Sequence, residues 1–147
     1  MSRAASRRSS ARSSVRSIIV DAGPLVALFR SRDKHHEAAK SALESTRALL
    51  LTTWPVVTEA CHFLSREGKR ALLTFIRRGA LRVEPLSADD IPRLDELLAR
   101  YERMDFADAT LVLLAEKTGV TEIFTLDRRD FEIYRTRTGR RFRLVSA

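Results

Sequence analysis

The sequence is short of the residues that build disulfide-linked or zinc-bound proteins. It contains one cysteine, Cys61, and three histidines among its 147 residues. A single cysteine cannot form an intrachain disulfide, and no group of His and Cys has the spacing of a zinc site. A lone thiol fits a reducing compartment, so we expect a cytoplasmic protein.

Long apolar runs are also missing. None approaches the roughly 20 residues that cross a bilayer, so no association with a membrane is expected. The first residues resemble a secretory signal, because basic side chains precede an apolar stretch. However, Asp21 and Pro24 interrupt that stretch, and no small-residue cleavage site follows it.

Acidic residues are absent from the first seventeen positions, which hold five arginines. We expect a disordered Arg/Ser-rich tail at 1–17 and one domain at 18–147, since 44% of the chain is hydrophobic and can form a core. The tail supplies +5 of the net charge of +8. This charge favours nucleic acid or an acidic partner, although a solvated, arginine-rich surface would produce it too.

Short apolar segments alternate with helical patterns along the rest of the chain. The patterns predict strands at 18–20, 48–52, 81–85, 122–126 and 142–145. They predict helices starting at Pro24, at 33–45, at 55–67 with Gly68 as its end, at 71–77, at 87–101, and at 106–117 closed by Gly119. This alternation predicts an α/β three-layer sandwich with a central, mostly parallel sheet.

Four carboxylates stand apart from the acids on polar helix faces. Asp21 and Asp127 end the first and fourth predicted strands, where parallel sheets form ligand sites. Glu59 lies on or beside an apolar helix face, and Asp108 begins the core-facing stripe of its helix. Each has a purely local alternative: the three aspartates could cap helices or turns, and Glu59 could pair with Arg66.

Four converging carboxylates would repel one another strongly unless cations lay among them. Hard oxygen ligands favour Mg²⁺ or Mn²⁺. Such ions suit phosphodiester hydrolysis, because they lower the pKa of a bound water and offset phosphate charge. The pattern therefore predicts a metal-dependent enzyme acting on a phosphodiester.

The same residues lie in four ordered motifs: "IIVDAGPLVAL", "VVTEACHFL", "DFADATLVLLA" and "IFTLDRRDF". From residue 18 to the C-terminus, the chain resembles the PIN-domain ribonucleases, and more narrowly the VapC-type toxins of toxin–antitoxin pairs. The resemblance implies a Mg²⁺- or Mn²⁺-dependent endoribonuclease acting on structured RNA. It places the metal-binding and catalytic positions at Asp21, Glu59, Asp108 and Asp127. It further implies a homodimer and inhibition by a small cognate antitoxin whose tail enters the acidic groove.

The chain departs from the family pattern in two places. Many members carry Ser, Thr or Asn two residues after the first Asp, where this chain has Gly23; Thr125 is a substitute source of a hydroxyl. The third and fourth motifs each offer a second acid. Asp105 and Asp130 are therefore possible accessory residues.

Basic residues near the C-terminus form the candidate RNA contacts, namely Arg128, Arg140 and Arg141. The last two lie in "RTRTGRRFR", whose guanidinium groups suit phosphates, although a solvated, hairpin-like edge has the same composition. Two other functions stay open: a housekeeping RNA-processing nuclease, and a non-catalytic module that binds partners through its acidic groove.

Overall fold

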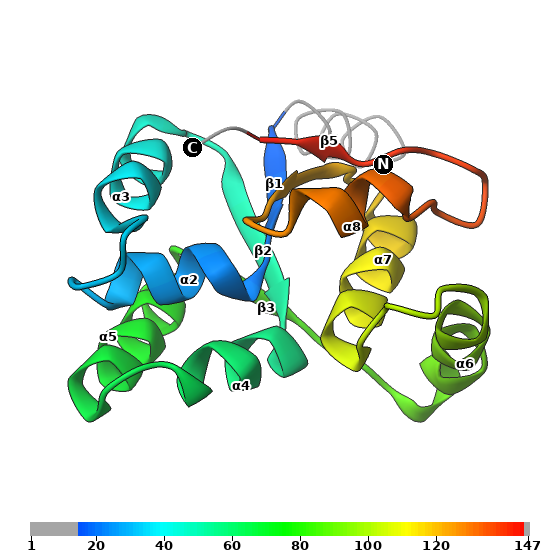
Figure 1. Cartoon of the computed structure of the whole chain (residues 1–147), viewed down its shortest axis with the longest axis horizontal. Helices are drawn as coiled ribbons and strands as arrows, with labels where there is room; N and C mark the ends of the chain where they lie inside the picture. The colour runs from blue at the N-terminus through cyan, green and yellow to red at the C-terminus, as the bar shows by residue number, and fades with distance from the viewer. Residues whose placement is uncertain (1–14, 146–147) are drawn as a thin grey trace, which may run out of the picture.

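A five-stranded parallel sheet forms the centre of the computed structural model, which describes residues 15–145 (Figure 1). The strand order is β3-β2-β1-β4-β5, and every neighbouring pair is parallel. This confirms the predicted sheet. The strands are β1 (Ser17–Val20), β2 (Leu49–Thr53), β3 (Arg82–Glu84), β4 (Glu122–Phe124) and β5 (Arg143–Leu144).

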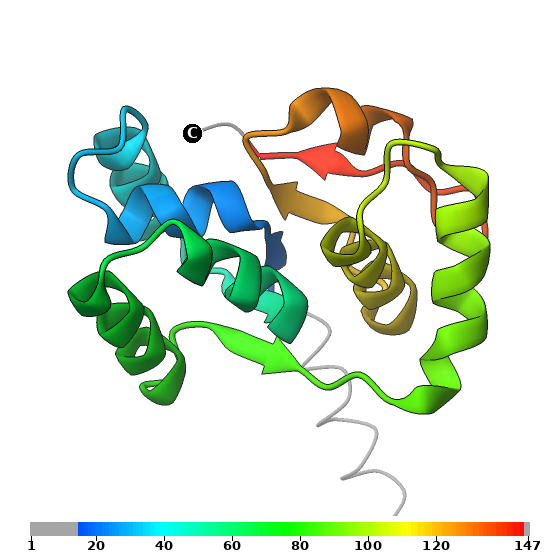
Figure 2. The same cartoon turned by 60° about the horizontal axis from the view of Figure 1, so that its bottom comes forward.

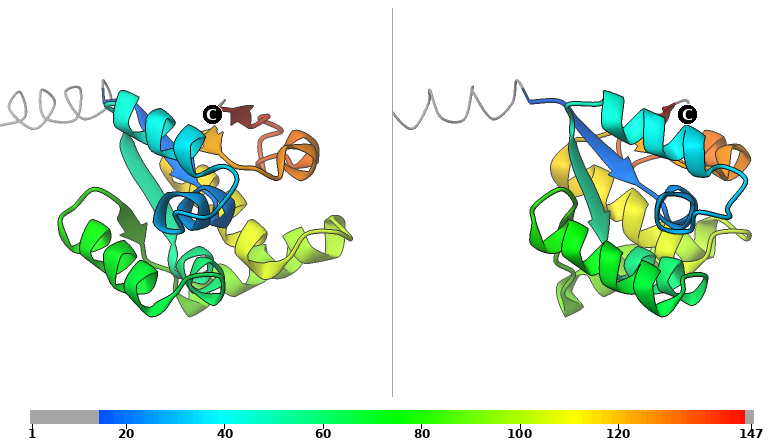
Figure 3. Two further views of the ribbon diagram at one scale, coloured as in Figure 1. Left: turned by 60° about the vertical axis from the view of Figure 1, so that its left-hand side comes forward. Right: turned by 90° about the vertical axis from the view of Figure 1, so that its left-hand side faces the viewer.

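Helices cover the sheet from two sides. The chain forms α2 (Ala22–Phe29), α3 (His36–Ser45), α4 (Trp54–His62), α5 (Arg66–Arg77), α6 (Ile91–Arg100), α7 (Phe106–Thr118) and α8 (Arg128–Ile133). Helices α2 to α5 gather on one side and α6 and α7 on the other (Figure 2). Side views show α3 lying next to α2 (Figure 3). Among residues 15–145, no helix has the length and apolarity needed to cross a membrane.

The strand order places a topological switch point beside β1. The chain moves outward from β1 through β2 to β3, and then returns to add β4 on the other side of β1. In parallel sheets, the crevice at the carboxyl ends of the strands at such a point is the usual ligand site. The backbone N–H of Asp21 donates to the carbonyl of Phe124 at 2.9 Å, which holds the two strand ends together there.

Helix α7 is buried along most of its length and points its N-terminus toward this crevice (Figure 2). Asp105 caps its start, since its carboxylate accepts a hydrogen bond from the backbone of Asp108 at 2.8 Å. Gly119 ends it with a φ of 76°, a left-handed conformation that glycine adopts without strain. The predicted helix at 106–117 and its C-terminal glycine are confirmed. The helix extends one residue beyond the prediction, to Thr118.

The predicted helix at 55–67 is wrong in its second half. Helix α4 ends at His62, and α5 begins at Arg66 with Ser65 as its N-cap, whose hydroxyl accepts from the Gly68 N–H at 3.1 Å. Gly68 therefore lies inside a helix. A Cβ at this position would lie 2.9 Å from the Phe29 carbonyl oxygen, so glycine here permits close helix packing and does not end a helix.

Three other boundaries differ from the sequence predictions. Helix α8 is not predicted, because its six residues carry no apolar period. Helix α3 begins at His36, since Asp33 instead accepts from the His35 N–H in the preceding turn. Ser17 already belongs to β1, although the composition places it in the tail; the rest of the predicted disorder lies almost wholly at 1–14, outside the described residues.

Candidate active site

Asp21 occupies the step from β1 to α2 at the switch point. It is 7% exposed, and both of its carboxylate oxygens are held. Oδ1 accepts from the Ala22 N–H at 2.8 Å, and Oδ2 accepts from the Thr125 hydroxyl at 2.7 Å. Burial raises the pKa of Asp21, and the two hydrogen bonds oppose that rise. The side chain is therefore fixed in orientation before any ligand arrives.

Gly23 and Thr125 explain the departure from the family pattern. A Cβ at Gly23 would lie 3.2 Å from the Cβ of Leu126, so the segment after β4 fills the space of a side chain here. That segment brings the buried Thr125 hydroxyl onto Asp21 from the neighbouring strand end. The Thr125 hydroxyl of the fourth motif therefore contacts the Asp21 carboxylate of the first motif directly.

Asp108 lies in the first turn of α7 and is 7% exposed. Its Oδ2 accepts a hydrogen bond from the hydroxyl of Tyr134 at 2.9 Å. Burial, followed by the negative charge of Asp105, raises the pKa of Asp108 to about 8. The positive end of the helix dipole favours an anion at this position, but it does not offset the burial.

Tyr134 is a site residue that the sequence did not reveal. It follows α8 and is buried, and its ring packs edge-on against Tyr101 and Phe131 with centroid separations of 5.1 and 5.0 Å. Burial and the Asp108 charge raise the pKa of Tyr134, so its hydroxyl keeps its proton and donates. A single tyrosine after an unpredicted helix carries no sequence signal that links it to Asp108.

Glu59 approaches the same region from α4. It is half-buried, and its pKa is raised first by burial and then by the charges of Asp105, Asp21 and Asp127. Three carboxylates from different segments thus act on it electrostatically. Val56, one turn earlier on α4, is fully buried, so Glu59 lies at the edge of the core as the pattern predicted.

Asp127 precedes α8 and is the most exposed of the four predicted acids. Its backbone N–H donates to the Thr125 hydroxyl at 3.0 Å. Burial and the adjacent Asp130 raise the pKa of Asp127, and Arg103 lowers it. Asp130 itself is buried and lies 3.7 Å from the Arg103 guanidinium, so its charge is partly compensated within the protein.

The acids predicted from the sequence therefore share one electrostatic field. The charge of Asp21 raises the pKa of Glu59, Asp108 and Asp127 alike, and Asp105 contributes to the first two. Carboxylates that destabilise each other's charged forms at a strand-end crevice suit a hard divalent cation, which would relieve the repulsion.

The crevice does not form a closed ligand cage. Over residues 15–145, no three His, Cys, Asp or Glu side chains are close enough to hold a metal ion as they stand. Mg²⁺ characteristically keeps several waters and binds only one or two carboxylates directly. The carboxylates of the crevice therefore suit Mg²⁺ even though they do not surround an ion. The same carboxylates do not suit zinc, whose sites in proteins are built mainly from His and Cys ligands.

The three arginines expected to contact RNA lie in different places. Arg128 begins α8, next to Asp127, and is exposed. Arg140 lies at the far end of α7 from Asp108, where its guanidinium donates to the Gly119 carbonyl at 3.0 Å. Arg141 is exposed and pairs through its backbone with Arg135, so this segment has the hairpin-like form of the alternative interpretation.

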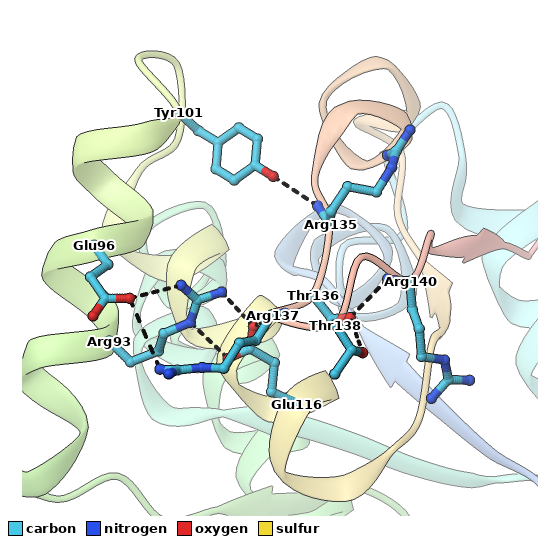
Figure 4. Close-up of polar contacts among 9 residues, drawn as sticks. All are labelled: Arg93, Glu96, Tyr101, Glu116, Arg135, Thr136, Arg137, Thr138 and Arg140. Carbon is cyan, nitrogen blue, oxygen red and sulfur yellow. Dashed lines mark hydrogen bonds and ion pairs between the residues drawn. The ribbon is translucent and has the colours of Figure 1, made fainter.

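A polar network holds the segment around Arg140 in place (Figure 4). Glu116 on α7 accepts two hydrogen bonds from Arg93 on α6, at 2.9 and 2.7 Å, and one from the backbone N–H of Arg137 at 2.7 Å. The Arg135 N–H donates to the Tyr101 hydroxyl at 3.1 Å. These contacts join α6, α7 and the C-terminal segment. They hold the backbone directly after Tyr134 in place.

The sheet order and the acidic crevice define a protein of the PIN-domain class. The family model described as "PIN domain" matches residues 18–136, and the chain belongs to this family. Among known proteins, the chain is similar to Ribonuclease VapC26 of Mycobacterium tuberculosis, with 30% identity over 134 residues that cover 87% of this chain and 99% of that protein.

A solved structure gives the same result. The chain is similar to VapC20 of Mycobacterium tuberculosis, described as a toxin that cleaves the sarcin–ricin loop. The TM-score is 0.62 and the sequence identity is 31%, over 72% of this chain and 86% of that one. The resemblance drawn from the four motifs is thereby confirmed.

Proposed function

We propose that this protein is a metal-dependent endoribonuclease and the toxin of a type II toxin–antitoxin pair. The observation that carries the proposal is the group of carboxylates from the β1–α2 junction, α4, α7 and the β4–α8 junction. They lie at the switch point of a PIN-domain sheet and raise one another's pKa values. A divalent cation would offset the repulsion among these carboxylates, and a cation at this place can bind a phosphodiester.

Asp21 and Asp108 are the residues that would hold the metal most directly. Both are buried, and each is oriented by a hydroxyl donor, Thr125 in one case and Tyr134 in the other. Mg²⁺ or Mn²⁺, when bound, supplies a water of lowered pKa and charge stabilisation for the phosphate. Because the pKa of Asp108 is raised to about 8, metal binding near neutral pH would release its proton.

Glu59 and Asp127 have complementary roles in the proposal. Both are more exposed than Asp21, so they can reach a metal through water or accept a proton from an attacking water. Asp105 fixes the first turn of α7 through the Asp108 N–H, and Asp130 is held near Arg103. We therefore assign both of these accessory acids to positioning.

The toxin assignment and its partners rest on the VapC relatives. We propose a structured RNA substrate, a small antitoxin that covers the acidic crevice, a homodimer, and action in the cytoplasm. A housekeeping nuclease would share the crevice and would need no dedicated inhibitor. Induced expression of the chain alone should arrest growth, whereas the Asp21→Asn variant should not; growth unaffected by active enzyme would favour the housekeeping role.

The cleavage reaction is tested with total cellular RNA and purified protein. Cleavage is expected with Mg²⁺ or Mn²⁺ and not with EDTA, and Asp21→Asn should lower the rate at least about 100-fold while the protein stays folded. Asp89→Asn, which neutralises an exposed acid outside the crevice, is the matched control. RNA binding without cleavage under every metal condition would identify a non-catalytic module instead.

A further inference from the structure

The acidic crevice creates an electrostatic problem for an enzyme that acts on RNA. Its carboxylates repel the phosphates on either side of the bond to be cut, and a bound metal offsets that charge only locally. Affinity for RNA comes largely from Lys and Arg contacts to phosphates. Arg140 does not lie beside the crevice, because its guanidinium donates to the Gly119 carbonyl at the opposite end of α7 from Asp108.

Besides Arg128, which lies next to Asp127, basic side chains lie around a groove of about 970 Å³ at the other end of α2 and α4. Arg30 and Arg32, from the loop after α2, line it together with the helix ends at His62 and Phe63. Both arginines are exposed, and neither side chain forms an ion pair or a hydrogen bond within residues 15–145. Glu67 also lines the groove, so its charge is mixed but basic on balance.

An aromatic side chain completes the groove. Phe63 lines it with 60% of its surface exposed, so its ring is open to a ligand in the groove. Exposed aromatic rings beside arginines are typical of surfaces that bind single-stranded nucleic acid, where bases stack on the rings and phosphates contact the guanidinium groups.

The groove lies within reach of the acidic crevice. Helices α2 and α4 lie side by side (Figures 1 and 2), and the residues that follow both helices line the groove. Asp21 precedes the first residue of α2 and Arg30 follows its last, a span of about 12 Å for eight helical residues. A stacked strand covers that distance in roughly three to four nucleotides, at about 3.4 Å each. Phe63 is the C-cap residue of α4 and comes four residues after Glu59, about one helical turn further along.

We infer that this groove binds the single-stranded RNA that flanks the cleavage position, with phosphates at Arg30 and Arg32 and a base on Phe63. The inference rests on the proposed ribonuclease activity and adds the surface that holds the substrate. It explains how a crevice lined by carboxylates retains a polyanion: the cationic contacts lie a few nucleotides away from the metal.

The salt dependence of RNA binding tests the two arginines. The probe is a fluorescein-labelled, single-stranded RNA of mixed sequence, with anisotropy measured in EDTA over a series of KCl concentrations. Each lost phosphate contact lowers the slope of log K against log salt by about 0.7, so Arg30→Ala/Arg32→Ala should lower it by about 1.4. Arg77→Ala/Arg78→Ala, which removes the same charge from the far end of α5, should leave the slope nearly unchanged.

Cleavage kinetics provide the second readout. The Arg30/Arg32 double variant should raise KM about tenfold at about 0.15 M salt with little change in kcat, because the contacts hold substrate and transition state alike. Phe63→Ala should weaken binding without changing the salt slope, since stacking involves no counterion release. Melting temperatures near that of the wild type verify that all variants are folded.

The outcomes separate this inference from the proposed function. Metal-dependent cleavage by the wild type, with a slope and KM that the groove variants leave unchanged, would overturn the inference and leave the ribonuclease assignment intact. A wild type that never cleaves RNA would instead refute the function. If Phe63→Ser dissociates a dimer while the arginine variants bind RNA normally, the groove is a protein interface and the inference is wrong.

Discussion

Replacing Asp108 by Asn should stabilise the metal-free protein while abolishing its activity. Asp108 is 7% exposed, and its pKa is raised to about 8, whereas an unfolded aspartate titrates near 3.9. At pH 7, this rise in the pKa of Asp108 lowers the free energy of unfolding by at most about 4 kcal/mol relative to an aspartate whose pKa folding leaves unchanged. Each pKa unit corresponds to about 1.4 kcal/mol.

The expected gain in the free energy of unfolding is smaller, about 1–3 kcal/mol at neutral pH. An Asn side chain still accepts the Tyr134 hydrogen bond, which is 2.9 Å long in the wild type. Its new amide donors, however, need partners in a buried site, and an unmet donor costs about 1–3 kcal/mol. The neighbouring acids help here, because the Asp105 charge that repels a carboxylate attracts an amide N–H.

The pH dependence gives the sign of the effect. Between about pH 4 and pH 8 the native protein keeps a proton on Asp108 that the unfolded chain has released, so wild-type stability falls as the pH rises. The amide of the variant does not titrate, so the advantage of Asp108→Asn should grow across this range and level off above pH 8. Urea unfolding in EDTA at about pH 5, 7 and 9 measures it. A variant that is less stable than the wild type at high pH, or a difference that does not vary with pH, would refute the reasoning.

Two further substitutions probe the surroundings of the site. Tyr134→Phe should weaken Mg²⁺ binding about tenfold in calorimetry, because it removes the hydroxyl that orients a carboxylate; Tyr101→Phe, which loses a hydroxyl bonded only to backbone, is the matched control. Equal losses in both variants would indicate a general packing effect. Gly68→Ala should lower the free energy of unfolding by about 1–3 kcal/mol, since its Cβ would lie 2.9 Å from the Phe29 carbonyl oxygen; unchanged stability would show that the helices separate easily.

Residues whose position follows from a single element were predictable from the sequence. Asp21 comes directly after a buried β-branched strand, and Asp108 begins a helix that is apolar along its length. Their places at a strand end and in a first helical turn need only local periodicity. Predicting that both side chains face one crevice required a further rule, that ligand sites lie at the carboxyl ends of parallel strands. The sheet of this protein follows that rule.

Contacts between distant segments were not predictable. The Tyr134 hydroxyl reaches Asp108 from 26 residues away, after a short helix that has no apolar period. The sequence predicts Gly68 as the end of a helix because glycine commonly ends helices, whereas here the close approach of α2 requires it. The sequence around Arg140 does not indicate that its guanidinium donates to the Gly119 carbonyl at the C-terminus of α7.

Direct measurement of metal binding tests the central claim most closely. Titration with Mn²⁺, followed by electron paramagnetic resonance, should show a saturable site in the wild type and at least about tenfold weaker binding in Asp21→Asn and in Asp108→Asn. Asp89→Asn should bind as the wild type does. Undiminished Mn²⁺ binding by both crevice variants would mean that Asp21 and Asp108 do not hold one ion together, and would contradict the account.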